Sequence, residues 1–243
     1  DATQEQVDNL VVRIGWAVVQ PAFAQQLADT LVQESGMGYG PDKYAKIQTK
    51  VRGGLRDMAG KRTVGIVEVD DSRGIMKVAK PMGVVGALMP VTNGEATPLL
   101  KAMFAIKTRN AIILAPHPRA KQTNTLAVDE IRRILKANGY PEDLVIAVDK
   151  VSLDASKELM AKCDMILATG GATMVKAAYS SGTPSQGVGA GNAVCIVDET
   201  ADLSDAADKI MRSKTFDHAT SCSTENSIAI NNTVYDAMLR ELE

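Results

Sequence analysis

The sequence predicts an α/β fold built around a parallel, doubly wound sheet. Four β-rich apolar runs alternate with helical patterns of about 10 to 17 residues, which is typical of helices that connect parallel strands. The strands are expected at 84–91, 111–115, 144–148 and 165–169. Signals for helix ends agree with this order, because Gly139 and Pro141 follow one helical pattern and Gly182 and Pro184 follow another.

Helices and a hairpin are expected before these units. The expected elements are a helical stretch at 4–34, a loop at 36–41, a helix ending near residue 59, and hairpin strands at 63–69 and 75–80. Leu10, Ile14 and Val18 recur at helical spacing in the first stretch. The polar run 70–74, which ends in glycine, joins the two hairpin strands.

The pattern changes after Gly191. A strand is expected at 193–197, a helix at 203–214, a polar loop around Cys222 and a strand at 227–230. This order predicts a second α/β unit.

Composition excludes several classes of partner. With 243 residues, 45% hydrophobic content and a net charge of −2, the chain has enough apolar residues for a sizeable core and no electrostatic attraction for nucleic acid. No apolar run is long enough to cross a bilayer, so no membrane partner is expected. Three cysteines without a secretory segment indicate reduced thiols and a cytoplasmic protein. The two histidines and the dispersed cysteines do not have zinc-ligand spacing, so no metal is expected.

Cys222 is the candidate nucleophile. It stands among serines and threonines and not in an apolar run. Thiolates attack carbonyl carbons, and an attacking cysteine needs access and local dipoles that lower its pKa from about 8.5. A lone cysteine is more often a small core residue, which is our interpretation of Cys163 and Cys195. A hydrolase pair with His218 is an alternative, but a spacing of four residues does not bring the two side chains together in a loop.

Asn93 is the candidate oxyanion donor. It follows the first strand of the sheet, and ligands of open α/β sheets bind at the carboxyl ends of strands. Thr97 is expected to cap the next helix and Pro98 to occupy its first position, so Asn93 lies in a strand-to-helix turn. A carboxamide there donates hydrogen bonds to developing negative charge, although asparagine is also common in turns for conformational reasons.

Asn93, Cys222 and five ordered blocks resemble the aldehyde dehydrogenase superfamily and, within it, the coenzyme A-acylating branch. The blocks are 107–113, 115–121, 167–182, 187–191 and 197–202. Each block alone is a weak signal, whereas their order along nearly the whole chain is specific. The resemblance implies an aldehyde dehydrogenase-like fold, with a Rossmann-like nicotinamide-cofactor domain at 1–190. It also implies the start of an α/β catalytic domain at 191–243 that is truncated here, and a homo-oligomer whose hairpin arm, about 63–80, pairs with another subunit.

The turn Thr169, Gly170, Gly171 is the candidate phosphate site of the cofactor. A strand meets a helix there, and the amino end of a helix attracts phosphate, although glycine pairs at such turns are often structural. The run 187–191 superficially matches a dinucleotide fingerprint. It does not follow the first strand of a βαβ unit, so we discount that interpretation.

The resemblance adds Pro90, Thr92, His117, Arg119 and Gly189 as cofactor contacts. The usual acidic residue for the ribose 2′-hydroxyl is missing, and Pro118 and Arg119 stand in its place. Both NAD and NADP therefore stay open, with Arg119 or Lys121 facing a 2′-phosphate or lying on the solvated surface.

The resemblance also implies a mechanism. Cys222 adds to a small aldehyde, Asn93 and the backbone N–H of Cys222 hold the oxyanion, and hydride transfer leaves a thioester. Hydrolytic relatives carry a glutamate base in the block that is 187–191 here, and no carboxylate occupies it. Coenzyme A is therefore the expected acyl acceptor, because water without a base is a poor one. Glu225 is an alternative base, but a structural role suits its position better.

The substrate is expected to be sulfoacetaldehyde, with acetaldehyde and succinic semialdehyde as alternatives. Gly94 and Glu95 follow Asn93 where acetaldehyde members of the family usually show proline, and the Cys222 segment resembles the sulfoacetaldehyde group. Lys101, Lys107 and Arg109 are candidate sulfonate partners if their helix turns them inward. Two other functions stay open, namely a nucleotide-binding fragment without activity and a thiol hydrolase or acyltransferase.

Overall fold

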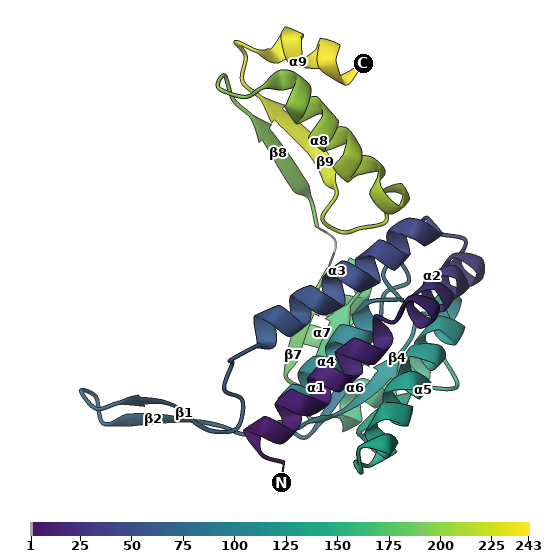
Figure 1. The fold of residues 1–243 in the computed structure, drawn as a ribbon, viewed down its shortest axis with the longest axis vertical. Coiled ribbons are helices and arrows are strands. Elements are labelled where there is room, and N and C mark those ends of the chain that lie inside the picture. The colour runs from purple at the N-terminus through teal and green to yellow at the C-terminus, as the bar shows by residue number, and fades with distance from the viewer. Residues whose placement is uncertain (1, 190) are drawn as a thin grey trace.

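A five-stranded parallel sheet forms the centre of the computed structural model, which describes residues 2–189 and 191–243 (Figure 1). Its strands are β3 (Val84–Leu88), β4 (Ala111–Ala115), β5 (Val145–Ala147), β6 (Met165–Thr169) and β7 (Ser185–Val188). They lie in the order β5-β4-β3-β6-β7. The chain starts in the middle, builds one half of the sheet and returns beside β3 to build the other. This topology confirms the predicted doubly wound sheet.

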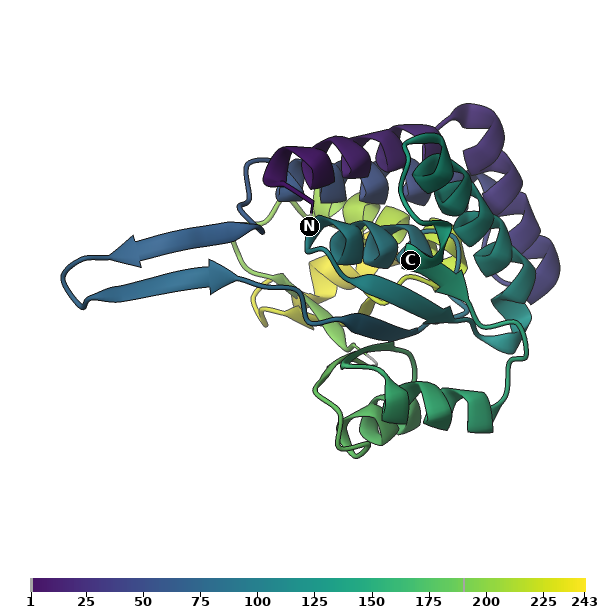
Figure 2. The same ribbon diagram turned by 90° about the horizontal axis from the view of Figure 1, so that it is seen from below.

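Helices connect the parallel strands and cover both faces of the sheet (Figure 2). They are α4 (Thr97–Lys107), α5 (Lys121–Ala137), α6 (Leu153–Lys162) and α7 (Ala172–Tyr179), with short 3-10 turns η1 (Pro118–Ala120) and η2 (Glu142–Leu144). Residues of α4 and α5 pack with β3, β4 and β5 in the larger apolar core, and those of α6 and α7 pack on the opposite face. Both faces of the sheet are therefore buried, as parallel sheets require.

Three further helices contribute residues to the larger apolar core. They are α1 (Gln4–Val18), α2 (Pro21–Ser35) and α3 (Gly40–Met58). The single helical stretch expected at 4–34 is wrong, because Pro21 starts a new helix, where its missing N–H costs no hydrogen bond. In the described part of the chain, no helix has both the length and the apolar composition that crossing a membrane would need.

Three local predictions around the sheet were wrong. β7 was not among the expected strands, because only its pairing with β6 forms a strand in a run with little apolar character. β3 ends at Leu88 and not at residue 91. Ala96 is the N-cap of α4, so Thr97 is its first helical residue and makes no side-chain cap.

A second α/β unit follows the sheet. It contains β8 (Ala193–Val197), α8 (Leu203–Thr215), η3 (Phe216–Ala219), β9 (Glu225–Ile230) and α9 (Tyr235–Leu242). β8 and β9 pair in parallel, and Val197, Ala207, Ile210 and Met238 form the unit's own small core. The division between the two domains was expected at residue 190, which lies outside the described residues.

The hairpin expected at 63–80 is present as β1 (Gly65–Asp70) and β2 (Ile75–Ala79). It projects from the body of the molecule as a two-stranded ribbon (Figures 1 and 2). The exposed large apolar side chains on it are Ile66, Val69, Ile75, Met76 and Val78.

Lys101 of α4 ties together the two central strands. Its Nζ donates to the carbonyl oxygen of Leu88 in β3 at 3.1 Å and to that of Leu167 in β6 at 2.8 Å. Burial lowers the pKa of Lys101 to about 7. Above a pH of about 7, Lys101 therefore loses its proton in the folded state, whereas the unfolded chain keeps this proton up to a pH of about 10.

We expect Lys101→Met to flatten the dependence of stability on pH. Between pH of about 7 and 10 the unfolded chain binds one proton more than the folded chain, so the wild-type free energy of unfolding rises by up to about 1.4 kcal/mol per pH unit relative to the variant. Urea titrations at three pH values measure this difference, with exposed Lys61→Met controlling for the loss of a lysine as such. Parallel curves for the wild type and Lys101→Met would contradict the expectation.

Candidate active site

A cavity of about 630 Å³ lies at the carboxyl edge of the sheet. Its walls come from the residues that follow β3, β4, β6 and β7 and from the loop 219–222 of the second unit. β3 and β6 are neighbours from the two halves of the sheet, so this is the switch point of the topology, where ligands of open α/β sheets bind.

The cavity brings together nine of the ten residues proposed from the sequence. They are Pro90, Thr92, Asn93, His117, Thr169, Gly170, Gly171, Gly189 and Cys222. Arg119 lies outside the lining, because its guanidinium donates to the main-chain carbonyl of Ser35 at the end of α2. Lys121, the other candidate for a 2′-phosphate, pairs with Asp149 at 3.0 Å.

Asn93 sits in the turn between β3 and α4. Its Oδ1 accepts a hydrogen bond of 2.6 Å from Lys46 Nζ. Its Nδ2 donates only a long bond of 3.3 Å, to Thr92 Oγ1, among its hydrogen bonds in the described structure. The carboxamide is therefore anchored through its oxygen and retains an N–H for a ligand in the cavity.

The loop before Cys222 has an unusual backbone. Asp217, His218 and Ala219 have φ angles of 50°, 51° and 58°, and each left-handed non-glycine residue costs roughly 1–2 kcal/mol. Cys222 is exposed at the end of this turn and lines the cavity. A Cβ atom at Gly191 would stand 3.1 Å from the carbonyl oxygen of Cys222, so glycine lets the two segments approach closely.

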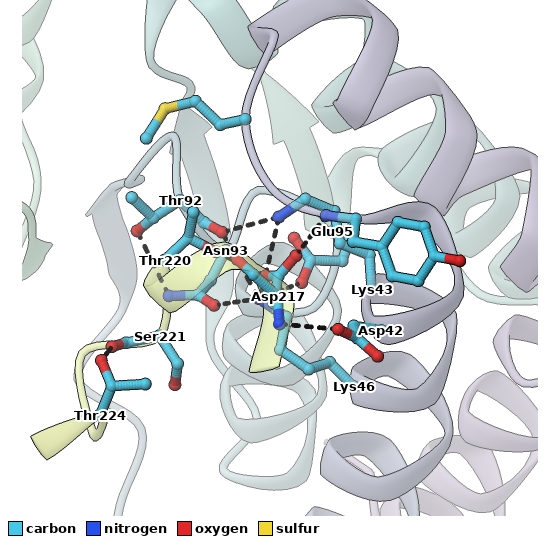
Figure 3. A network of polar contacts seen from close by, with 12 residues as sticks. Asp42, Lys43, Lys46, Thr92, Asn93, Glu95, Asp217, Thr220, Ser221 and Thr224 are labelled. Carbon is cyan, nitrogen blue, oxygen red and sulfur yellow. Dashed lines mark hydrogen bonds and ion pairs between the residues drawn. The ribbon is translucent and has the colours of Figure 1, made fainter. Parts of the chain in front are cut away.

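The side chain of Asp217 stabilises this turn through several polar contacts (Figure 3). Its Oδ2 pairs with Lys43 at 3.1 Å and with Lys46 at 2.5 Å, and it accepts from Thr220 at 2.5 Å. Its Oδ1 accepts from the N–H of Tyr39 at 2.8 Å. Burial alone would raise the pKa of Asp217, but the hydrogen bonds from Lys46, Thr220 and Tyr39 outweigh it and hold the pKa below its usual value.

Lys43, Lys46, Glu95 and Asp217 form a buried ionic cluster that the sequence analysis missed. Their side chains are 0–4% exposed. One signal was available, because Lys43 lies on the same helical stripe as the buried Ile47 and Val51 of α3. A lysine at a core position of an amphipathic helix requires an acidic partner, although the pattern does not say which one.

One end of the cavity is formed by the turn between β6 and α7. β6 ends at Thr169 and α7 begins at Ala172, so Gly170 and Gly171 leave the first N–H groups of α7 open to a phosphate. His117 Nδ1 accepts from the N–H of Arg119 at 3.1 Å. Burial and the charge of Arg119 lower the pKa of His117, so the ring is neutral and carries its proton on Nε2.

Charged residues are missing from the lining of the described cavity. Its only titratable side chains are His117 and Cys222. Thr224 and Asn226 face it, whereas Glu225 between them faces α8 and accepts from Ser213 at 3.0 Å. Side chains alternate between the two faces of an extended chain, so Glu225, the alternative base, points away from the thiol.

Other candidates from the sequence lie elsewhere. The proposed sulfonate partners are turned away from the cavity: Lys101 donates to the strand carbonyls, Lys107 pairs with Asp8, and Arg109 donates to the carbonyl of Ala79. His218 stacks on Tyr39 with ring centroids 5.7 Å apart, which does not support a Cys-His pair. Within residues 2–189 and 191–243, no group of three or more histidine, cysteine, aspartate or glutamate side chains is arranged to hold a metal ion.

Comparison with known proteins identifies the family. Residues 23–243 match the family model described as "Aldehyde dehydrogenase family". The chain belongs to the aldehyde dehydrogenase family. This aldehyde dehydrogenase chain is 48% identical to the "Sulfoacetaldehyde dehydrogenase" of Acholeplasma sp over 240 residues, which are 99% of this chain and 50% of that protein. It therefore spans about half the length of the curated relatives it matches.

Solved structures agree with this assignment. The acetylating aldehyde dehydrogenase of Geobacillus thermoglucosidasius superimposes with a TM-score of 0.94 at 34% identity, covering 100% of this chain and 54% of that chain. The propionaldehyde dehydrogenase of Rhodopseudomonas palustris, solved with bound CoA and an acylated cysteine, gives a TM-score of 0.86 at 29% identity. That match covers 99% of this chain and 55% of the other.

We expect Asp217→Asn to destabilise the fold strongly. The substitution leaves Lys43 and Lys46 buried without this carboxylate, and breaking a buried ion pair costs about 3–5 kcal/mol. Asp208→Asn is the control, because its pair with Arg212 is exposed and contributes less than about 1 kcal/mol. Urea unfolding of both variants measures the difference, and equal losses would show that the buried cluster contributes little.

Proposed function

We propose that this chain carries the nicotinamide-binding part and the nucleophile of a coenzyme A-acylating aldehyde dehydrogenase. The observation that supports it is the lining of the described cavity, which holds Cys222 and Asn93 but no carboxylate. Hydrolysis of a thioester needs a general base to activate water. A thiol acceptor needs less activation, because it ionises closer to neutral pH.

Cys222 and Asn93 have the central roles in the proposed oxidation. The thiolate of Cys222 forms a bond to the carbonyl carbon of the aldehyde, and the carbonyl π electrons move to the oxygen. The Nδ2 of Asn93 and the backbone N–H of Cys222 donate to that oxyanion. When bound, the nicotinamide cofactor accepts the hydride from the former aldehyde carbon. A thioester on Cys222 is the result.

Coenzyme A releases the acyl group in this proposal. Its thiolate forms a bond to the thioester carbonyl carbon, the same donors hold the second oxyanion, and the bond to Cys222 breaks. The acyl group leaves as acyl-coenzyme A, and Cys222 returns as thiolate. The solved relative with bound CoA and an acylated cysteine supports this sequence of steps.

The cofactor would lie across the carboxyl ends of β3, β4, β6 and β7. We assign its phosphates to the turn Thr169–Gly171 with the first turn of α7, and its ribose to His117. Pro90, Thr92 and Gly189 complete the contact surface. The division into a cofactor domain at 1–190 and a catalytic domain beginning at 191 belongs to the same proposal.

Sulfoacetaldehyde is the proposed substrate. The 48% identity to a sulfoacetaldehyde dehydrogenase supports it. Among the described residues, no cation lines the cavity, so the sulfonate would be bound by neutral donors such as Ser221 and Asn226. Acetaldehyde and succinic semialdehyde are the alternatives that the assay must rank.

We also propose a cytoplasmic homo-oligomer. The three cysteines are free thiols in the structure, which suits a reducing compartment. The exposed apolar ribbon β1–β2 suits an arm that pairs with a second copy of the chain.

Coenzyme A dependence tests the proposed function. The full natural polypeptide that carries residues 1–243 is mixed with NAD or NADP and each of the three aldehydes, with and without coenzyme A, and nicotinamide reduction is followed by its near-ultraviolet absorbance. We expect turnover that requires coenzyme A and is greatest with sulfoacetaldehyde. Cys222→Ala is the matched control and should abolish turnover under all conditions.

Other outcomes would identify the competing functions. Equal turnover without coenzyme A would mean that water deacylates Cys222. Nucleotide binding without reduction would indicate a binding fragment. Cofactor-free cleavage of a thioester substrate would indicate a thiol hydrolase.

We expect Asn93→Ala to lower kcat by about a hundredfold or more, because an oxyanion donor contributes roughly 3 kcal/mol. The KM for the nicotinamide cofactor should change little, since Asn93 acts on the aldehyde oxygen. Steady-state kinetics measure both values. A variant that retains wild-type kcat would remove Asn93 from the oxyanion site.

A further inference from the structure

The ammonium group of Lys46 contacts both the turn that carries Asn93 and the loop that precedes Cys222 (Figure 3). Lys46 Nζ, on α3, lies 2.6 Å from Asn93 Oδ1, 2.5 Å from Asp217 Oδ2 and 3.0 Å from Glu95 Oε1. The side chain of Lys46 is only 4% exposed. Lys46 Nζ also donates a long hydrogen bond of 3.5 Å to the carbonyl oxygen of Thr92, so oxygen acceptors surround the ammonium group.

The contact with Lys46 fixes which way the Asn93 carboxamide points. An ammonium group donates hydrogen bonds and accepts none, so the Asn93 atom that faces it must be the oxygen. The Nδ2 group then points to the other side of the amide. Without Lys46, the two orientations of the amide differ only by the weak bond to Thr92 at 3.3 Å.

Lys43 occupies the same cluster but lacks this contact. Its Nζ pairs with Asp217 at 3.1 Å and donates to the carbonyl oxygen of Thr92 at 3.1 Å. The loop before Cys222 is therefore held by both lysines, whereas the described contacts of Asn93 Oδ1 are to Lys46 alone. Replacing Lys43 should therefore lower the stability of the cluster without removing the contact that orients the Asn93 amide.

We propose that Lys46 is a positioning residue that directs the Asn93 amide N–H toward the oxyanion. The inference rests on the proposed function, because it assumes that Asn93 holds an oxyanion formed at Cys222. Lys46 touches neither the substrate nor the thiol. In this proposal its effect on kcat passes through Asn93, whereas its ion pair with Asp217 contributes to the stability of the loop before Cys222.

A mutant cycle in the full natural polypeptide tests this role. We expect Lys46→Met to lower kcat by about the factor that Asn93→Ala does, and the double variant to be no slower than Asn93→Ala alone. The KM for the nicotinamide cofactor should stay within about twofold of wild type. Lys43→Met is the matched control, and it should lose less than about fivefold in kcat while losing stability to a similar degree.

Alkylation of Cys222 by iodoacetamide provides a second readout. The reaction forms no oxyanion, so a change in Asn93 orientation should leave its rate unchanged, whereas collapse of the Cys222 loop would alter it. If Lys46→Met does not fold, the charge-balanced variant Lys46→Met with Glu95→Gln is measured instead, with Glu95→Gln as its reference.

The outcomes are distinct. A hundredfold loss for Asn93→Ala combined with less than about fivefold for Lys46→Met would overturn the inference and leave the proposed function intact. Additive losses in the double variant would also overturn it, since Lys46 would then act by another route. Full activity of Asn93→Ala would contradict the oxyanion role itself, and the inference would fail with it.

Discussion

The geometry of the site depends on the buried ion pairs of Lys43 and Lys46 with Asp217. These side chains join α3 to a loop more than 170 residues later in the chain. In the interior each charge is stabilised by its partners, so removing one member of the cluster weakens the others. It compensates the left-handed backbone at 217–219, and Cys222, the proposed nucleophile, follows that backbone. The β3–α4 turn contacts the same cluster through Asn93, so the two segments that carry the proposed catalytic residues are held by one set of ion pairs.

The chemistry of the cavity is defined by dipoles. Two carboxamides, Asn93 and Asn226, and several hydroxyls line it, and the described lining carries one imidazole and one thiol as its titratable groups. Such an environment stabilises a developing oxyanion without competing for its proton. The charged residues of the buried cluster do not line the cavity, and they contact the polar groups that do.

The sequence correctly predicted the elements whose bounds are determined by their own residues. The strands at 111–115 and 165–169 agree to the residue, because their apolar runs are bounded by polar turns. β7 was missed, because Ser185–Val188 becomes a strand only by pairing with β6. Nine candidate site residues reached one cavity, since strand ends of a parallel sheet meet at one edge. The ionic cluster was not predicted, because no local pattern links Lys43 to a partner 174 residues away.

The β1–β2 ribbon has a consequence for handling the protein. It exposes five large apolar side chains and two strand edges, and an isolated two-stranded ribbon is marginally stable in water. Unpaired edges of this kind recruit other chains indiscriminately when the correct partner is scarce. The cross-strand pair of Glu68 and Lys77, at 2.7 Å, is the charged gatekeeper in its centre. The ribbon is therefore a place where strand pairing between chains would begin if the protein is concentrated, and a charged substitution on its apolar face would reduce that tendency.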